Sequence, residues 1–146
     1  MNKYMNLIGQ NVRRAALVKV DTKIKNNVLK KYASLLDKEK KSILKANAKD
    51  REFAERKRLK NNLIDRLSID QEKLNNIGNS INKIIKLKDP IDNTLKKWSR
   101  PNGLKISKVS IPIGVIGVIY ESRPNVTSDV AALCFKSGNA VILKGG

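Results

Sequence analysis

The sequence of 146 residues has no histidine and only one cysteine. A single cysteine cannot form a disulfide within the chain, which excludes a disulfide-stabilised scaffold. Zinc sites built from cysteine and histidine need four such ligands, so they are excluded as well, and we expect no bound metal. Catalytic groups of the serine–histidine–aspartate and cysteine–histidine types lack their histidine base. Several large enzyme classes are therefore excluded before any motif is considered.

Long hydrophobic runs are also missing. No segment approaches the roughly 18 consecutive apolar residues of a transmembrane helix, and the longest apolar stretch, 111–120, is broken by proline and glycine. The N-terminus has no secretory signal pattern. The first twenty residues contain no acidic side chain and loosely resemble a mitochondrial presequence, but we favour an opening helix of the folded domain. We therefore expect a cytoplasmic protein without a membrane partner.

Acidic residues are scarce relative to basic ones: 13 Asp and Glu stand against 31 Lys and Arg, a net charge of +18. Such a charge can indicate a nucleic-acid partner. However, most of the basic residues are lysine, whose codons are rich in A and T, and arginine is not enriched. Aromatic residues, which would stack on bases, make up only 4% of the chain. We therefore attribute the charge to the base composition of the gene and keep nucleic-acid binding as the competing hypothesis.

Apolar residues at helical spacing predict four helices within residues 1–88. The apolar residues that recur at this spacing are Met5, Ile8, Val12, Ala15, Ala16 and Val20 in the first helix, Ile24, Val28, Tyr32, Leu35 and Leu36 in the second, Ile43, Leu44, Ala48, Phe53 and Ala54 in the third, and Leu74, Ile77, Ile81, Ile84 and Ile85 in the fourth. Asp21 and Asp70 are expected to cap the second and fourth helices. The charged run 51–60 is expected to be a solvated helix end or loop. Asp89-Pro90 should end the last helix.

From residue 104 onward the pattern becomes that of strands. Alternation over 104–112 predicts a partly exposed strand, and the β-branched run 114–120 predicts a strand buried on both faces. A helix over about 126–136, ended by a left-handed Gly138, leads to an apolar strand over 140–144. Strand, helix and strand together form a βαβ unit, which should cross over with right-handed connectivity.

Ligands of open parallel sheets bind beyond the carboxyl ends of the strands. The loops 121–125 and 144–146 are therefore the candidate sites. Lys144, followed by two glycines, could meet a phosphate or a ribose, although a solvated lysine explains it equally well. Arg123 precedes a proline and offers a rigidly placed guanidinium for an anion.

Two other features have structural explanations. Gly114 and Gly117 lie inside the predicted strand and do not form a phosphate-binding loop, so we expect that a neighbouring helix or strand packs closely against them. Cys134 stands among apolar residues of the predicted helix. Nothing near it in the sequence would lower its pKa, so we expect a buried structural thiol and not a nucleophile.

The segment 113–146, IGVIGVIYESRPNVTSDVAALCFKSGNAVILKGG, closely resembles the cofactor-domain signature of the γ-glutamyl phosphate reductase family, within the aldehyde dehydrogenase superfamily. ILKANAKD at 43–50, IDRLSI at 64–69 and LKDP at 87–90 resemble the helical N-terminus of that family. The resemblance implies an α/β fold in which a helical layer is followed by the first βαβ unit of an aldehyde-dehydrogenase-type dinucleotide-binding domain. Residues 1–146 would form one partial domain, with a helical region over 1–88 and the start of the NADP-binding sheet over 104–146.

The resemblance further implies NADPH-dependent reduction of L-glutamate 5-phosphate to L-glutamate 5-semialdehyde, a step of proline biosynthesis. In such enzymes a cysteine thiolate attacks the acyl phosphate, and the nicotinamide then reduces the thioester. Lys144 matches the lysine that approaches the adenosine ribose. Asn125 is the candidate for the amide that stabilises the oxyanion, with Arg123 as the alternative. The expected cofactor-binding residues are Ser122, Arg123, Pro124, Asn125, Lys144, Gly145 and Gly146.

The family's nucleophilic cysteine belongs to a later catalytic domain that these 146 residues do not contain, and Cys134 falls in a helix where it would only pack. We therefore expect a chain that is inactive alone and binds NADPH weakly or not at all. It would be either the remnant of a truncated gene, such as a pseudogene product, or one half of a split enzyme with a complementing C-terminal half. The competing hypothesis becomes a basic helical nucleic-acid-binding protein with a decayed enzyme tail.

Overall fold

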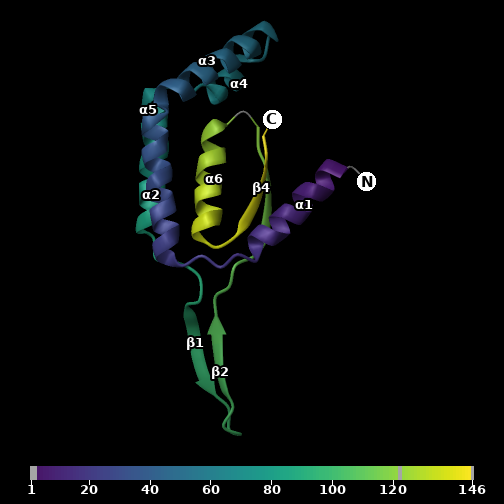
Figure 1. Ribbon diagram of the computed structural model, residues 1–146, viewed down its shortest axis with the longest axis vertical. Helices are drawn as coiled ribbons and strands as arrows, with labels where there is room; N and C mark the ends of the chain where they lie inside the picture. Colours follow the sequence, from purple (N-terminus) through teal and green to yellow (C-terminus); the bar gives the residue numbers. More distant parts are fainter. Residues whose placement is uncertain (1–2, 122, 146) are drawn as a thin grey trace.

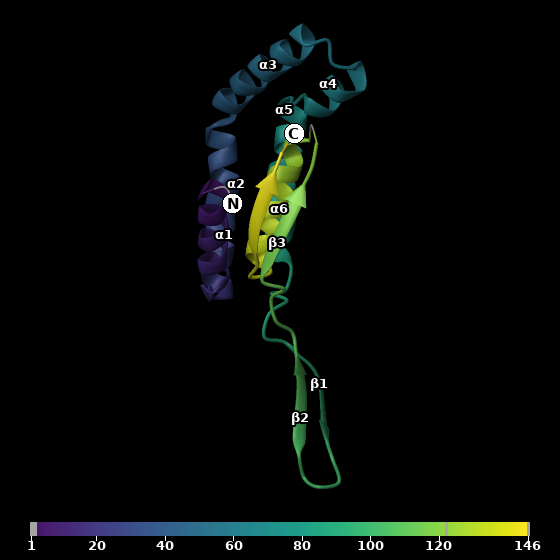
Figure 2. The same cartoon turned by 90° about the vertical axis from the view of Figure 1, so that its right-hand side faces the viewer.

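The computed structural model describes residues 3–121 and 123–145. Its elements in chain order are α1 (Lys3–Ala16), α2 (Thr22–Lys38), α3 (Lys40–Arg56), α4 (Asn61–Leu67), α5 (Gln71–Lys86), β1 (Thr94–Ser99), β2 (Lys105–Val109), β3 (Val115–Ile119), α6 (Pro124–Lys136) and β4 (Ala140–Lys144). Figures 1 and 2 show α6 between the β3–β4 sheet and the paired helices α2 and α5, with α1 beside β4. This arrangement confirms the predicted α/β fold, in which helices precede a βαβ unit. No helix in the described part of the chain is both long and apolar enough to cross a membrane.

Helices α2 and α5 begin at the two predicted caps. The Asp21 carboxylate accepts a hydrogen bond from the backbone N–H of Ile24 at 2.8 Å, and Asp70 accepts one from the backbone N–H of Lys73 at 2.7 Å. Each bond satisfies an amide that the first helical turn would otherwise leave without a partner. The caps set where each helix begins and hence which side chains it turns toward the core.

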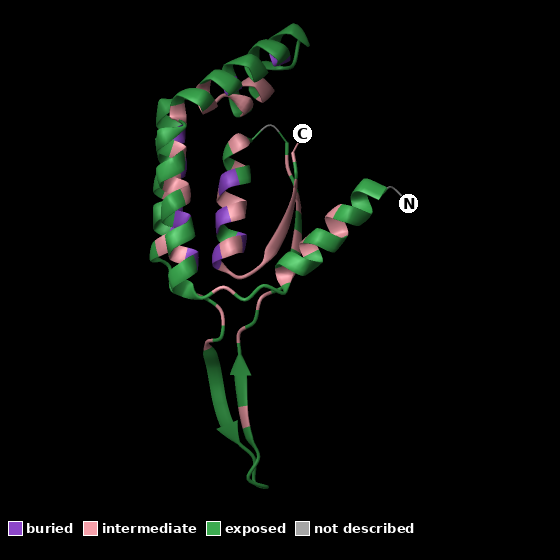
Figure 3. Cartoon of the chain, in the orientation of Figure 1, coloured by how far each residue is buried: buried purple, intermediate pink, exposed green. Residues whose placement is uncertain are grey.

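The core lies where α2, α5 and α6 meet. Figure 3 shows buried residues on the sides of these helices that face one another. The buried cluster consists of Leu29, Leu74, Ile77, Ile81, Ile84 and Ala132. Four of its members come from α5 and were predicted as that helix's apolar face. Burial of one stripe of isoleucine and leucine side chains therefore holds α5 in position.

The predicted apolar face of α2 is confirmed at Tyr32 and Leu36, which pack against the core, and is wrong at three other positions. Ile24, Val28 and Leu35 are 51%, 45% and 49% exposed, whereas Lys25 and Leu29 are buried. The reason is an ion pair, because the Lys25 ammonium lies 2.9 Å from the Asp89 carboxylate just after α5. A lysine with a buried partner occupies a core position, which apolar periodicity alone does not reveal.

Other helix predictions also need correction. Helix α1 ends at Ala16, so Val20 lies beyond it. In α3, Ala54 is buried but Phe53 is 59% exposed. The short helix α4 was not predicted at all, since its seven residues offer too few turns for a periodic pattern. The buried Asn47 side chain fixes its end: Asn47 donates to the Leu67 carbonyl at 2.9 Å and accepts from the Ile69 amide at 2.7 Å.

An antiparallel hairpin of β1 and β2 extends away from the rest of the chain (Figure 1). Strand β2 lies within the predicted strand over 104–112, but β1 was missed. Every residue of β1 is exposed, so the strand has no alternation of buried and exposed positions that a pattern could detect. Trp98 pairs with Ile106 across the hairpin.

Strands β3 and β4 are parallel neighbours, in register from Val115 opposite Ala140 to Ile119 opposite Lys144. Strand β4 has the predicted bounds. The prediction that β3 is buried on both faces is wrong, since Val115 is 40% and Ile119 is 85% exposed. Helix α6 packs on one face of this sheet, and α1 contacts β4 and β3 (Figure 1). Ile119, at the end of β3, remains exposed to solvent.

Gly114 and Gly138 have conformational roles, whereas the close packing predicted for Gly114 and Gly117 is not found. A Cβ atom at Gly114 or Gly117 would meet nothing within 4 Å, so the packing explanation is wrong for both positions. Gly114 has φ +114°, a conformation that side chains rarely adopt. Gly138 has φ +68° directly after α6, as predicted for a left-handed helix end.

Candidate functional site

The carboxyl ends of β3 and β4 meet at one edge of the sheet, where both candidate loops begin. The Tyr120 amide, just after β3, donates to the Lys144 carbonyl at 3.0 Å. A Cβ atom at Gly145 would lie 3.6 Å from the Tyr120 hydroxyl oxygen. The two loops are therefore direct neighbours, as the parallel topology requires. Ser122 and Gly146, which also belong to the predicted site, lie outside the described residues.

The first of these loops is shorter than predicted, because α6 already begins at Pro124. Pro124 is suited to this place, since the first helical position needs no backbone N–H. Arg123 is the residue before the helix, and Asn125 lies in the first turn. The Tyr120 hydroxyl forms a hydrogen bond with Thr127, which ties this first turn to the end of β3. Arg123 and Asn125 are thus held at the sheet edge by a fixed helix start.

Lys144 stands at the end of β4 with an exposed side chain. Its ammonium donates to the carbonyl of Gly145 at 2.6 Å, so the side chain folds over the loop that follows the strand. An ammonium has three donors, which leaves others for a ligand. Lys144 therefore presents an exposed cation directly beside Gly145.

A pocket of about 440 Å³ opens beside the start of α6, where this helix faces α4 and α5. It is lined by Asp65, Arg66, Ser68, Ile69, Lys73, Asn76, Ile77, Ser80, Arg123, Pro124, Asn125 and Asp129. Three of the predicted site residues, Arg123, Pro124 and Asn125, therefore share one cavity. Lys144 and Gly145 do not line it, so the predicted site residues fall into two groups.

The charged residues of this pocket include several that sequence reasoning missed. Asp129 follows Asn125 by one helical turn, and the Asn125 amide donates to it at 3.4 Å. The i, i+4 spacing within the matched signature was a signal that could have found Asp129. Arg66 and Lys73 reach the pocket from α4 and α5, and no local pattern connects them with α6. Only the tertiary fold brings these cations to Arg123.

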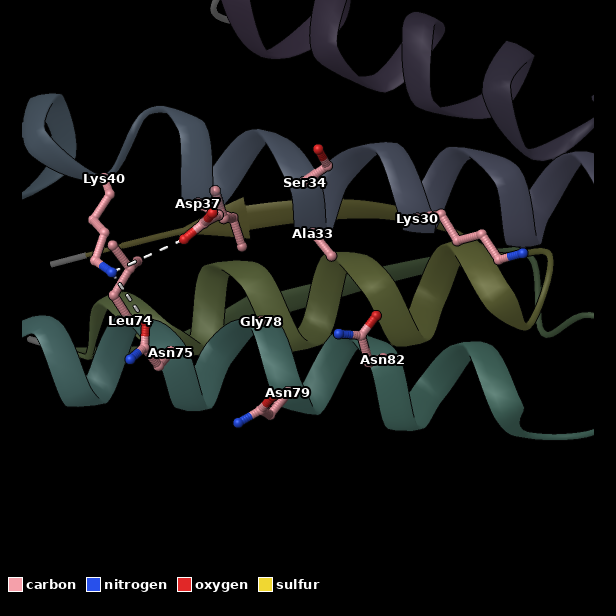
Figure 4. Close-up of a pocket in the computed structure, with 11 residues that line it drawn as sticks. Lys30, Ala33, Ser34, Asp37, Lys40, Leu74, Asn75, Gly78, Asn79 and Asn82 are labelled. Atoms are coloured by element: carbon pink, nitrogen blue, oxygen red, sulfur yellow. Dashed lines mark hydrogen bonds and ion pairs between the residues drawn. The ribbon is translucent and has the colours of Figure 1, made fainter.

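Two other hollows differ in character from this pocket. A surface pocket of about 510 Å³ between α2 and α5 contains Lys40, which lies 3.9 Å from Asp37 and donates to Asn75 at 3.3 Å (Figure 4). The Lys40 ammonium in this pocket is therefore already paired with groups of the chain itself. A wide groove between α1 and β4 is lined mainly by apolar residues such as Val12 and Ile142. Neither hollow contains a predicted site residue.

Cys134 is buried, with 5% of its surface exposed, as predicted. Burial raises the pKa of its thiol, so the reactive thiolate is disfavoured. It lies on α6 and forms no part of the pocket at the start of that helix. Within the described residues no group of three or more histidine, cysteine, aspartate or glutamate side chains could hold a metal ion.

Comparison with known proteins gives a consistent result. The γ-glutamyl phosphate reductase of a Nitratiruptor species is 52% identical over 130 residues, which cover 89% of this chain and 32% of the relative. The γ-glutamyl phosphate reductase of Ruthia magnifica subsp. Calyptogena magnifica is 47% identical over an alignment that includes the whole chain and 36% of the relative. The chain is homologous to the N-terminal third of γ-glutamyl phosphate reductases. The resemblance inferred from the sequence is confirmed.

Solved structures give the same answer for the fold. The γ-glutamyl phosphate reductase from Thermotoga maritima superposes with a TM-score of 0.89 at 42% identity, over 94% of this chain and 34% of that one. The enzyme from Saccharomyces cerevisiae superposes with a TM-score of 0.91 at 32% identity. No protein-family model matches the chain. The chain thus spans about a third of the length of the γ-glutamyl phosphate reductases it matches, and none of these similarities supports the nucleic-acid-binding alternative.

Proposed function

We propose that this chain supplies the N-terminal, cofactor-domain portion of a γ-glutamyl phosphate reductase, which reduces L-glutamate 5-phosphate to L-glutamate 5-semialdehyde with NADPH in proline biosynthesis. We place this activity in the cytoplasm. The observation that carries the proposal is the sheet edge at which the matched signature converges. There Arg123–Asn125 and Lys144–Gly145 follow parallel strands that are in register. Homology to reductases of the same name supports the assignment.

In this proposal the cofactor lies at the carboxyl edge of β3 and β4. The residues present suit an anionic dinucleotide, because the exposed Lys144 ammonium retains donors there for a phosphate or a ribose. Lys144 would hold the ribose and phosphate portion, and the other residues proposed to bind the cofactor are Ser122, Pro124, Gly145 and Gly146. NADPH, when bound, supplies the hydride for the reduction.

Asn125 and the pocket beside it would receive the acyl phosphate. An amide N–H directed at a carbonyl oxygen stabilises the negative charge that develops when a nucleophile adds to that carbonyl. Asn125 is exposed at the mouth of the pocket, and its only hydrogen bond among the described residues is the long one to Asp129. Its donors are therefore available to substrate. Arg123, at the same mouth, is the alternative and would attract the phosphate.

The nucleophile of the reaction must come from outside these 146 residues. Cys134 is buried, and its raised pKa opposes formation of a thiolate. It is also separated from the pocket that we assign to the substrate. We therefore expect the isolated chain to show no reduction of L-glutamate 5-phosphate with NADPH and at most weak binding of NADPH.

A genetic experiment tests the proposal. Residues 1–146 would be joined to the C-terminal two thirds of the Nitratiruptor reductase and expressed in a bacterium that requires proline because it lacks its own reductase. We expect growth without proline, retained in the Asn79→Ala control, whose side chain is exposed on α5. The C-terminal two thirds alone should not support growth. A soluble, folded chimaera that fails where the intact Nitratiruptor enzyme succeeds would refute the proposal.

A further inference from the structure

Asp129 carries a carboxylate that the chain itself leaves poorly satisfied. Its Oδ1 atom is buried and has no hydrogen-bond partner among the described residues. Its Oδ2 atom accepts only the 3.4 Å bond from the Asn125 amide. In the described part of the chain no lysine or arginine nitrogen lies within 4.0 Å of it. A carboxylate with so few donors at the wall of a cavity is expected to have a partner that the chain does not provide.

The surrounding pocket carries charges of both signs. Arg66 and Arg123 line it, and neither guanidinium has a hydrogen bond or ion pair to a described residue. Lys73 donates to the carbonyl of Ser68 at 2.9 Å and so remains near the pocket wall. A cavity with unpaired cations and an unpaired carboxylate is complementary to a ligand that is itself zwitterionic. A simple anion would not use the carboxylate.

The spacing of Asn125 and Asp129 agrees with the length of a glutamyl group. The two residues are four positions apart on α6, about 6 Å along the helix at about 1.5 Å per residue, and the Asn125 amide nitrogen lies 3.4 Å from Asp129 Oδ2. The α-nitrogen of glutamate lies four bonds from the γ-carbonyl carbon, roughly 5 Å away in an extended chain with bonds of about 1.5 Å. A substrate whose γ-carbonyl meets Asn125 can therefore place its α-ammonium group at Asp129.

We propose that Asp129 is a specificity-determining residue whose carboxylate accepts a hydrogen bond from the α-ammonium group of the amino-acid substrate. The unpaired guanidiniums of the pocket face the carboxylate and the phosphate of that substrate. This inference rests on the proposed function and adds the recognition of the α-amino group. A charge-assisted hydrogen bond of this kind favours an amino acid over the same carbon chain without nitrogen. L-Glutamate and glutarate are such a pair.

The test is a titration of the 146-residue chain with L-glutamate and, separately, with glutarate, followed by NMR shifts of backbone amides. We expect the native chain to bind L-glutamate at least about tenfold more tightly than glutarate, a difference of about 1.4 kcal/mol. Asp129→Asn should bring the two affinities within about twofold. The matched control is Asp37→Asn, which changes an exposed carboxylate of α2 and should keep the tenfold preference. Circular dichroism spectra would confirm that both variants are folded.

Three results would overturn the inference: a native chain that binds neither compound, a native chain that binds both equally well, or an Asp129→Asn variant that still prefers L-glutamate tenfold. The titration contains no NADPH and involves no turnover, so its outcome is separate from the growth experiment. A chimaera that supports growth, combined with a chain that shows no preference for L-glutamate, would refute this role of Asp129 alone. A folded but inactive chimaera would refute the proposed function.

Discussion

The ion pair of Lys25 and Asp89 gives the most detailed stability prediction. The side chains are only 4% and 13% exposed, and the nitrogen and oxygen lie 2.9 Å apart. Asp89 also accepts hydrogen bonds from the Thr22 hydroxyl at 2.7 Å and from the Ile91 amide at 3.1 Å. The pair connects the start of α2 with the segment that leaves α5 for the hairpin. Its loss should therefore weaken the packing of the helical region against the rest of the chain.

Replacing Asp89 by asparagine leaves the Lys25 ammonium buried beside a neutral amide. Loss of one partner of a buried pair costs about 3–5 kcal/mol of the free energy of unfolding. We expect the lower end, because Asp89 retains some contact with solvent. Lys25→Met should cost less, about 1–3 kcal/mol, because Asp89 keeps its bonds from Thr22 and Ile91.

The pH dependence follows from the direction of the Asp89 pKa. Burial by itself would raise this pKa, but the hydrogen bonds from Lys25, Thr22 and Ile91, together with the charge of Lys25, lower it overall. A carboxyl with a lowered pKa in the folded state contributes stability above its unfolded pKa of about 3.9 and loses it as the pH falls through the folded value. The stability difference between the native chain and Asp89→Asn should therefore be constant near neutral pH and shrink below about pH 4.

The assay is urea unfolding at pH 7 and at a series of acidic pH values, followed by helical circular dichroism. The double variant Lys25→Met/Asp89→Asn would measure the coupling between the two residues. A cost of Asp89→Asn below about 1 kcal/mol, or a larger cost for Lys25→Met than for Asp89→Asn, would contradict the reasoning.

Three further predictions concern single residues. Ile81→Ala, at a core position that is 0% exposed, should lower the free energy of unfolding by about 2–5 kcal/mol, and a value below about 1 kcal/mol by urea unfolding would contradict the described core. Asp70→Ala removes the acceptor of the Lys73 amide and should lower the free energy of unfolding by about 0.5–2 kcal/mol. Asp70→Asn keeps an acceptor and should cost much less. Equal losses of stability in the two variants would argue against capping by Asp70. Cys134 should react with a thiol reagent at least about tenfold more slowly in the folded chain than in urea, because it is buried and its pKa is raised; equal rates would show an accessible thiol.

The sequence predicted well those elements whose limits are set by residues within or next to the element itself. Asp70 is followed by a regular stripe of leucine and isoleucine, so both the start of α5 and its buried face are set within one segment. The strand over 140–144 is bounded by Gly138 on one side and by Gly145 on the other, and its limits were correct. The specific signature over 113–146 likewise revealed the resemblance to γ-glutamyl phosphate reductases, which the comparisons confirm.

The features that the sequence missed depend on contacts between distant segments. Lys25 is a core residue only because Asp89, 64 positions away, provides its partner. Strand β1 has no buried side, so no periodic pattern marks it. The pocket beside Asn125 includes Arg66 and Lys73, which reach it only after α4 and α5 have packed near α6. The periodicity of the sequence located the two loops of the candidate site. It could not locate the pocket beside them, because residues of three helices form that pocket.

The central claim is that these residues form the working N-terminal third of a γ-glutamyl phosphate reductase. The most direct measurement is the rate at which the purified chimaera with the C-terminal two thirds of the Nitratiruptor enzyme oxidises NADPH in the presence of L-glutamate 5-phosphate. We predict substrate-dependent oxidation that falls by about 10²–10³ in kcat in the Asn125→Ala variant and is unchanged in Asn79→Ala. A folded chimaera without such oxidation would contradict the account, whereas full activity of Asn125→Ala would contradict only the role of Asn125 and favour Arg123.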